Sequence, residues 1–167
     1  MKMATLDFTD DGDIPNHPSW PLIIYAAALD RSVIQDEFAF DKLFKQNGWD
    51  IGFRNGIYPF PHYHSNSHEA LGIARGSATV RFGGDTGQIV EVQAGDAALL
   101  PAGTGHQLIS ATDDLLVIGA YPPGPVRDLM RSGELERTQI RKRIAAVVKP
   151  PTDPICGQRG PMLDLWK

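Results

Sequence analysis

One segment says most about this chain: Gly56-Ile-Tyr-Pro-Phe-Pro-His62-Tyr-His64-Ser-Asn-Ser-His68-Glu69. It places three histidines and one carboxylate within eight residues, and a fourth histidine, His106, follows the turn-forming run Pro101-Ala-Gly103-Thr-Gly105. Neutral imidazole nitrogens and a carboxylate oxygen form a ligand set suited to a divalent transition metal. The segment therefore predicts a metal site. The simpler alternative is a pair of exposed histidines on an edge strand.

Strand alternation separates the candidate ligands from their neighbours. Alternate side chains of a strand share a face, so His62 and His64 can point into one cavity. Glu69 has the opposite parity, and the turn-forming residues 65–67 between them can reset the register. Glu69 then begins a second strand, on which His68 faces the other way. This pattern favours Glu69 over His68 as a ligand, and we interpret His17, next to Pro18, as a loop residue.

The segments around the histidines predict a β structure. Short runs of apolar or alternating residues, separated by glycine turns, fill the chain from Trp49 to Ala120. They predict strands at Ala78–Phe82, Ile89–Val92, Ala97–Leu100, His106–Ser110 and Leu115–Tyr121. Strands at this spacing are typical of an antiparallel sandwich or barrel. The expected fold class is all-β with short flanking helices.

Both flanks carry weaker signals. Pro21–Leu29 is rich in branched and aromatic residues and predicts a strand. Ser32 can cap a helix that runs to Gln46, and Asn47-Gly48 supplies a left-handed stop. Residues 126–147 have a broken helical pattern, and we expect Trp166 to pack back on the domain.

Length and charge restrict the class of protein. The length of 167 residues predicts one domain over 1–167. The segments that contain the candidate ligands form its core at 56–110, and a helical, proline-rich extension follows at 122–167. A net charge of −4 gives no overall attraction to nucleic acid or to an anionic membrane. Residues 127–149 are basic, but acidic side chains are interleaved with the arginines, so we interpret them as a solvated helix face.

The expected location is the cytoplasm. No apolar targeting segment stands at the N-terminus, and no apolar run approaches membrane-spanning length. The single cysteine, Cys156, cannot form an internal disulfide and suits a reducing compartment.

The spacing of the motif residues resembles that of the cupin superfamily. Gly56-x5-His62-x-His64-x4-Glu69-x6-Gly76 is similar to the first cupin motif at every fixed position. Gly95-x5-Pro101-x-Gly103-x2-His106 is similar to the second, in which only the final asparagine is replaced, by Ser110. The flanks resemble those of uncharacterised small single-domain bacterial cupins. We interpret the motif glycines as structural, at tight turns and close strand approaches.

The resemblance implies a double-stranded β-helix, or jelly-roll barrel, with a metal near one mouth. Carried over by position, the metal ligands are His62, His64, Glu69 and His106. The implied cofactor is one divalent transition metal, among Fe, Mn, Ni, Co and Zn. The family also implies a small-molecule ligand or substrate and a homodimer, with Pro21–Leu29 as a candidate element for sheet packing or strand exchange.

Two hypotheses about activity follow. The first is a small metal-dependent enzyme (dioxygenase, isomerase or lyase) acting on a sugar or a small oxygenated acid. The second is a non-catalytic cupin that binds a metal or a small molecule. Arg54, Tyr58 and Phe60 share the parity of His62. Arg54 could hold a substrate carboxylate and Tyr58 could donate a proton; the alternative is a surface arginine and a core tyrosine.

Overall fold

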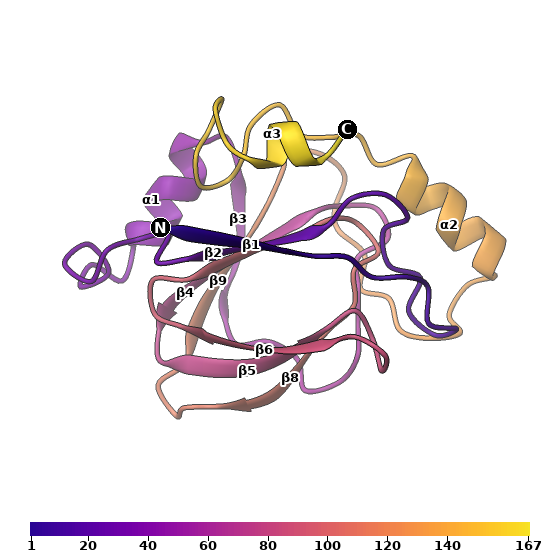
Figure 1. Cartoon of the computed structure of the whole chain (residues 1–167), viewed down its shortest axis with the longest axis horizontal. Helices are drawn as coiled ribbons and strands as arrows, with labels where there is room; N and C mark the ends of the chain where they lie inside the picture. Colours follow the sequence, from indigo (N-terminus) through magenta and orange to yellow (C-terminus); the bar gives the residue numbers. More distant parts are fainter.

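Two antiparallel sheets form the body of the protein in a computed structural model that describes all residues, 1–167 (Figure 1). The strands are β1 Lys2–Leu6, β2 Leu22–Ala26, β3 Asp50–Asn55, β4 Glu69–Arg75, β5 Ser77–Phe82, β6 Gln88–Gln93, β7 Ala97–Leu100, β8 His106–Ala111 and β9 Leu116–Tyr121. The helices are α1 Ala39–Gln46, α2 Arg137–Ala145 and α3 Met162–Leu165. The predicted jelly-roll fold with short flanking helices is confirmed.

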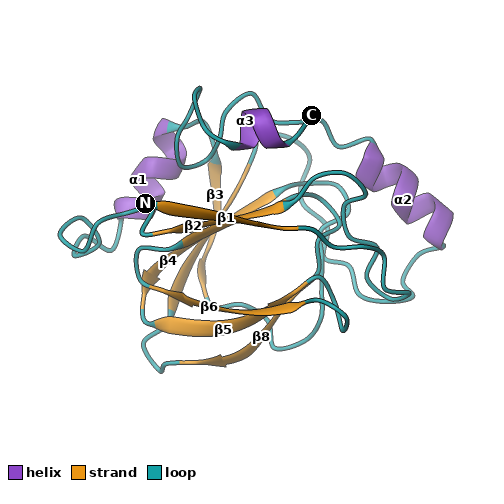
Figure 2. Ribbon diagram, in the orientation of Figure 1, coloured by secondary structure: helices purple, strands orange, loops and turns teal.

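The strand order places β7 and β4, which come from the middle of the chain, at the centre of the larger sheet. The larger sheet runs β1-β2-β7-β4-β9-β3 and the smaller runs β6-β5-β8, and they face each other in Figure 2. Side chains from both inner faces form one apolar cluster, which includes Leu71, Val80, Phe82, Leu100 and Val117. Burial of this surface, at about 25 cal/mol per Å², stabilises the sandwich. The cluster fills part of the space between the two sheets.

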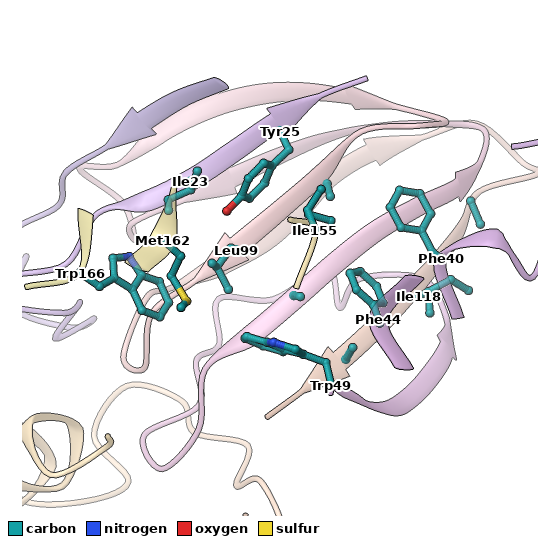
Figure 3. Close-up of a cluster of buried hydrophobic side chains, with 14 residues drawn as sticks. Ile23, Tyr25, Phe40, Phe44, Trp49, Leu99, Ile118, Ile155, Met162 and Trp166 are labelled. Atoms are coloured by element: carbon teal, nitrogen blue, oxygen red, sulfur yellow. The ribbon is translucent and has the colours of Figure 1, made fainter. Parts of the chain in front are cut away.

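The outer face of the larger sheet is also buried, because α1 and the C-terminal tail cover it (Figure 3). Phe40 and Phe44 of α1 pack beside Trp49, and Trp166 packs from the end of the chain. The indole Nε1 of Trp166 donates a hydrogen bond to the Pro21 carbonyl at 2.9 Å. The expected return of Trp166 to the domain is confirmed, and β4 is buried on both faces.

Two motif glycines are required by the backbone. Gly95 has φ +97°, and a β-carbon there would lie 2.7 Å from the Leu29 carbonyl oxygen. Gly103 has φ +87°, and a β-carbon would lie 2.5 Å from Ile144. Both positions combine left-handed backbone with a close neighbour, which only glycine accepts without strain. The structural interpretation of these two residues is confirmed.

The flanking helices are shorter than the sequence predicts. Helix α1 begins at Ala39, and Ser32 does not cap it. The Asp36 carboxylate accepts the Phe38 N–H at 3.0 Å, and backbone turns at Asp30–Asp36 precede it. Such local side-chain-to-backbone bonds compete with a helix. In the pattern at residues 126–147, only Arg137–Ala145 is helical, with Glu136 as its N-cap.

Strand β1 was not predicted, because Lys2–Leu6 has no strict alternation of apolar and polar residues. It pairs along its length with β2, from Lys2↔Ala26 to Leu6↔Leu22. Strand β2 therefore lies between β1 and β7, so its backbone has no free edge. Self-association through Pro21–Leu29 stays a prediction, and backbone pairing of β2 with a second chain would require β1 or β7 to move. None of the helices is long and apolar enough to cross a membrane.

Candidate metal centre

Three side chains converge at one end of the barrel. The imidazoles of His64 and His106 and the carboxylate of Glu69 each offer a ligand atom, and these atoms lie within 4.8 Å of one another. His106 Nε2 is 3.0 Å from Glu69 Oε2, and His64 Nε2 is 3.4 Å from Glu69 Oε1. All three residues are buried. The first motif and the second therefore meet at one point in space.

Each of these residues comes from a different element. Glu69 is the first residue of β4 in the larger sheet, and His106 is the first residue of β8 in the smaller one. His64 lies in the segment between β3 and β4, where its carbonyl accepts the Gly103 N–H at 2.7 Å. The cluster thus lies between the two sheets, and the turn that contains Gly103 fixes the backbone of His64.

Backbone carbonyls set the tautomers of the histidines. Nδ1 of His64 bonds to the Asp128 carbonyl, and Nδ1 of His106 lies 3.3 Å from the Thr104 carbonyl. A carbonyl can only accept, so in the neutral rings Nδ1 carries the hydrogen and Nε2 keeps its lone pair. Second contacts of this kind orient ligating histidines in metal sites. Both free lone pairs face Glu69.

The atoms that face one another here fit a metal cation. Glu69 Oε2 is buried and accepts no hydrogen bond, although His106 Nε2 is 3.0 Å away. Two acceptors at this distance repel unless a proton or a cation lies between them. Neighbouring ligands of one octahedral ion, each bound at about 2.1 Å, would lie about 3 Å apart. The donor set and its spacing therefore suit a divalent transition metal.

The charges of Glu69 and the neighbouring histidines affect one another's pKa values. Burial would raise the pKa of Glu69, but His64 and His106 outweigh it and hold this pKa well below its usual range. Burial lowers the pKa of His64, yet the neighbouring Glu69 carboxylate reverses the effect and leaves it raised. The carboxylate is thus ionised at neutral pH, as a metal ligand must be.

His62 lies beside this cluster and does not belong to the group within 4.8 Å. Its ring centroid is 3.9 Å from that of His106, and its Nδ1 lies 3.0 Å from the Phe60 carbonyl. Antiparallel backbone bonds join the two residues, with His106 N–H donating to the His62 carbonyl at 2.9 Å. Burial and the neighbouring His106 lower the pKa of His62 to about 3, so its ring is neutral.

His68 lies elsewhere, in an aromatic cluster on the tail side of the larger sheet. Its ring centroid is 4.9 Å from that of Trp166 and 5.6 Å from that of Trp20. Its Nδ1 accepts the Ala102 N–H at 2.9 Å, and its Nε2 lies 3.2 Å from the Val148 carbonyl. Both ring nitrogens are occupied, so this histidine holds the tail and has no free lone pair.

A cavity of about 240 Å³ opens onto the cluster. His62, His64, Glu69 and His106 all line it, so the space next to the ligands is accessible to a small molecule. Its other walls include Phe53, Asn55, Tyr58, Leu71, Tyr121 and Arg127. Tyr58 is half exposed and its ring is edge-on to His62, with centroids 5.2 Å apart. Tyr58 therefore lines this cavity, and its role as a proton donor stays a prediction.

Arg54 does not line the cavity, contrary to the expectation from parity. Its guanidinium pairs with the Asp41 carboxylate of α1 and lies 4.3 Å from the Phe38 ring centroid. Strand β3 ends at Asn55, so alternation does not continue through Pro59 and Pro61 to the histidines. Phe53 and Asn55 face the cavity instead, and Arg54 between them faces α1.

Arg127 is the cationic residue that the sequence interpretation missed. The sequence predicts that Arg127 lies on a solvated helix face, whereas in the structure it precedes α2 and lines the cavity. No local pattern in the sequence indicates this position, because Pro125 can equally begin a helix or end an extended segment.

Comparisons with known proteins agree with this fold. The family described as "Cupin domain" matches residues 55–118. A protein of Bacillus subtilis described as "Uncharacterized protein YjlB" is 39% identical over 165 residues, which cover 99% of this chain and 97% of that relative.

Solved structures resemble the chain more distantly. Tomato vicilin is 13% identical over 75% of this chain and 33% of its own, with a TM-score of 0.43. A variant of Bacillus subtilis oxalate decarboxylase is 18% identical over 81% of this chain and 35% of its own, with a TM-score of 0.40. The chain spans about a third of the length of each, and likeness at this level says nothing about activity.

Proposed function

This chain belongs to the cupin superfamily as a small bacterial cupin, and from that premise we propose that it is a metal-dependent enzyme. The proposed substrate is a small oxygenated molecule, either a sugar or an acid. The proposed cofactor is one divalent ion among Fe, Mn, Ni, Co and Zn. The proposed ligands are His62, His64, Glu69 and His106.

The observation that carries this proposal is the contact between Glu69 and His106. A buried carboxylate oxygen without a hydrogen bond faces an imidazole nitrogen at 3.0 Å. An unpaired buried polar atom of this kind costs about 1–3 kcal/mol unless something binds it. Because a solvent-accessible cavity adjoins the pair, a bound ion could also meet a substrate.

His62 is proposed as the fourth ligand. The Phe60 carbonyl holds its Nδ1, so its Nε2 lone pair is free, and its ring lies against that of His106. Its Nε2 lies outside the group of three ligand atoms, so ligation would require the side chain to move toward them. Three neutral histidines and one carboxylate would leave a divalent ion with a net charge of about +1 and two open positions if octahedral.

The chain's own residues have distinct tasks in such a site. Tyr121 holds the Glu69 carboxylate by a hydrogen bond, and Asp128 holds His64 through its carbonyl. Tyr58, half exposed beside His62, is the proposed proton donor to a bound substrate. When bound, the metal supplies Lewis-acid polarisation, or dioxygen chemistry if it is Fe(II).

The test begins with elemental analysis of untagged protein, followed by a screen of small sugars and acids with the native metal in place. Stoichiometric metal together with metal-dependent turnover supports the proposal. Oxygen uptake that depends on substrate would identify a dioxygenase. Binding without turnover would instead support the non-catalytic alternative. Protein that neither holds nor takes up a divalent metal would refute the proposed enzyme and also a non-catalytic role in metal binding.

A further inference from the structure

We propose that Arg127 binds a carboxylate, so that the substrate of this cavity is a small organic acid and a neutral sugar is excluded. This inference rests on the proposed function, because it assumes that the cavity beside the metal ligands is the substrate site. It narrows that function to one of its two substrate classes. Three observations and one argument from charge complementarity support it.

Arg127 is held at the cavity by contacts that leave most of its donors free. Its guanidinium carbon lies 4.3 Å from the Tyr121 ring centroid, and Nη2 donates to the Gly52 carbonyl at 3.2 Å. The Tyr121 hydroxyl is in turn bonded to Glu69. A guanidinium has five N–H donors. In Arg127, one of them donates a hydrogen bond to the protein, namely the bond from Nη2 to the Gly52 carbonyl. The Tyr121 ring therefore holds a guanidinium with unused donors at the cavity wall.

Arg127 also has no acidic partner. Six other arginines lie within 4.0 Å of a carboxylate, namely Arg54, Arg75, Arg81, Arg137, Arg141 and Arg143. Arg127 forms no such pair, like Arg31, Arg131 and Arg159, and it is the one of these four that lines this cavity. Glu69 is the only acid in the cavity wall, and its partners are His64, His106 and Tyr121. The positive charge at this wall is therefore not compensated by the protein.

Charge complementarity favours an anion over a neutral ligand. A ligand that fills the cavity removes water from Arg127, and a charged group that loses water without a counter-charge costs free energy. A carboxylate matches the planar fork of a guanidinium with two parallel hydrogen bonds. The hydroxyls of a sugar can accept hydrogen bonds but carry no charge to offset the arginine.

The size of the cavity favours a small acid. Its volume is about 240 Å³, whereas pockets for drug-sized ligands span about 300–1,000 Å³. The walls beyond Arg127 offer neutral polar groups at Asn55 and Tyr58, and apolar contacts at Phe53 and Leu71. A molecule with one carboxylate and a few further atoms, among them a hydroxyl or keto oxygen, fits this combination.

The experiment compares matched acid and neutral probes on untagged protein whose metal content has been measured. Lactate is paired with propane-1,2-diol and pyruvate with hydroxyacetone, and dissociation constants are measured by calorimetry and ligand-observed NMR. The variants are Arg127→Gln and Arg127→Lys, with Arg54→Gln as the matched control because Arg54 lies outside the cavity. Each comparison is repeated on protein stripped of metal by a chelator.

The proposal predicts that wild-type protein binds each acid more tightly than its neutral partner. Arg127→Gln should weaken acid binding by about 10- to 100-fold, as for loss of a charged hydrogen-bond pair. Binding of the neutral probes and metal content should stay unchanged, Arg127→Lys should retain part of the affinity, and Arg54→Gln should match wild type. If Arg127→Gln does not fold, the Arg127→Lys comparison alone decides.

Three results would overturn the proposal: wild-type protein that does not prefer the acids, equal acid binding in wild type and the Arg127 variants, or equal weakening of acids and neutral probes. Failure of the proposed function is a separate result. A protein that takes up no metal refutes the enzyme, yet the metal-free comparison still shows whether Arg127 selects carboxylates.

Discussion

The phenol of Tyr121 donates a hydrogen bond to Glu69 Oε1, which joins the last residue of β9 to the first residue of β4. Burial and the adjacent Glu69 charge raise the pKa of Tyr121, so its hydroxyl keeps its hydrogen at neutral pH. The bond occupies one carboxylate oxygen and leaves Oε2 facing His106. Tyr121 thereby orients the carboxylate with Oε2 toward His106.

Tyr121→Phe is expected to weaken metal binding by about 10- to 100-fold, the usual effect of losing a hydrogen bond to a ligand. Competition with a chromophoric chelator measures the affinity. Tyr63→Phe is the control, because Tyr63 packs in a separate apolar cluster with Ile14 and Ile144. Equal affinities in Tyr121→Phe and wild type would show that the hydroxyl does not support the ligand.

Single replacement of each proposed ligand should sharply lower bound metal. Alanine at His64, Glu69 or His106 removes an atom of the converging group, and His68→Ala should keep the metal because that ring faces the tail. Elemental analysis of folded, untagged protein gives the metal per chain. Loss of metal in His68→Ala equal to that in the ligand variants would overturn the assignment.

His62→Ala is the informative member of this series. A fourth ligand would lower the affinity by at least about tenfold on removal, whereas a histidine that only packs against His106 would leave it unchanged. Chelator competition separates the two outcomes.

His17 should make the protein less stable in mild acid. Burial lowers its pKa from 6.5 to about 4, and its Nδ1 accepts the Trp20 N–H at 2.9 Å. Between these values the unfolded chain binds a proton that the folded protein does not. The free energy of unfolding is therefore complete above about pH 6.5 and falls as the pH drops toward 4, by up to about 1.4 kcal/mol per pH unit.

Urea unfolding from neutral pH to about pH 4 measures this slope in wild type and in His17→Asn, which can keep an acceptor near Trp20. The difference between the two proteins isolates His17, because the other histidines are common to both. Parallel slopes would contradict the assignment.

Asp153 should be a strong anchor of the C-terminal tail. It is fully buried, and its carboxylate accepts hydrogen bonds from the Tyr25 hydroxyl at 2.6 Å and from the N–H groups of Ile155, Cys156 and Met162. Asp153→Asn replaces one acceptor with a donor that faces other donors. We expect a loss of about 2–4 kcal/mol in the free energy of unfolding.

Chemical denaturation compares this variant with Asp164→Asn, whose side chain is exposed on α3 and should change stability by less than about 0.5 kcal/mol. A similar small effect in both variants would show that the buried network contributes little.

The strands were predictable because their signals are local. Alternation in Ser77–Phe82 and the glycine turns on either side set the hairpin without help from distant residues. The start of α1 was not predictable from Ser32, since the Asp36 side chain forms a competing turn that leaves no capping signature.

The candidate site was predictable as far as its motif spacing extends. His64, Glu69 and His106 lie within 4.8 Å of one another, and the cavity wall beyond them depends on tertiary structure. The alternation of side chains did not predict the direction of Arg54, because strand β3 ends at Asn55 and the alternation does not continue to His62. Arg127 enters the wall from beyond a proline-rich loop, and no local pattern links it to Tyr121, whose ring it covers.

The place of Glu69 in the sheet has a consequence for the order of assembly. Strand β4 pairs with β7 on one side and β9 on the other, with Glu69 opposite Leu100 and Ala70 opposite Ala120. Such distant pairings form late, because long loops must close first. His106 lies in the other sheet, so we expect the carboxylate to reach it only once β4 has joined its own sheet and the two sheets have packed together. We therefore expect metal to bind after the protein has folded. The metal content per chain would then report the fraction of chains in which the sheet is complete.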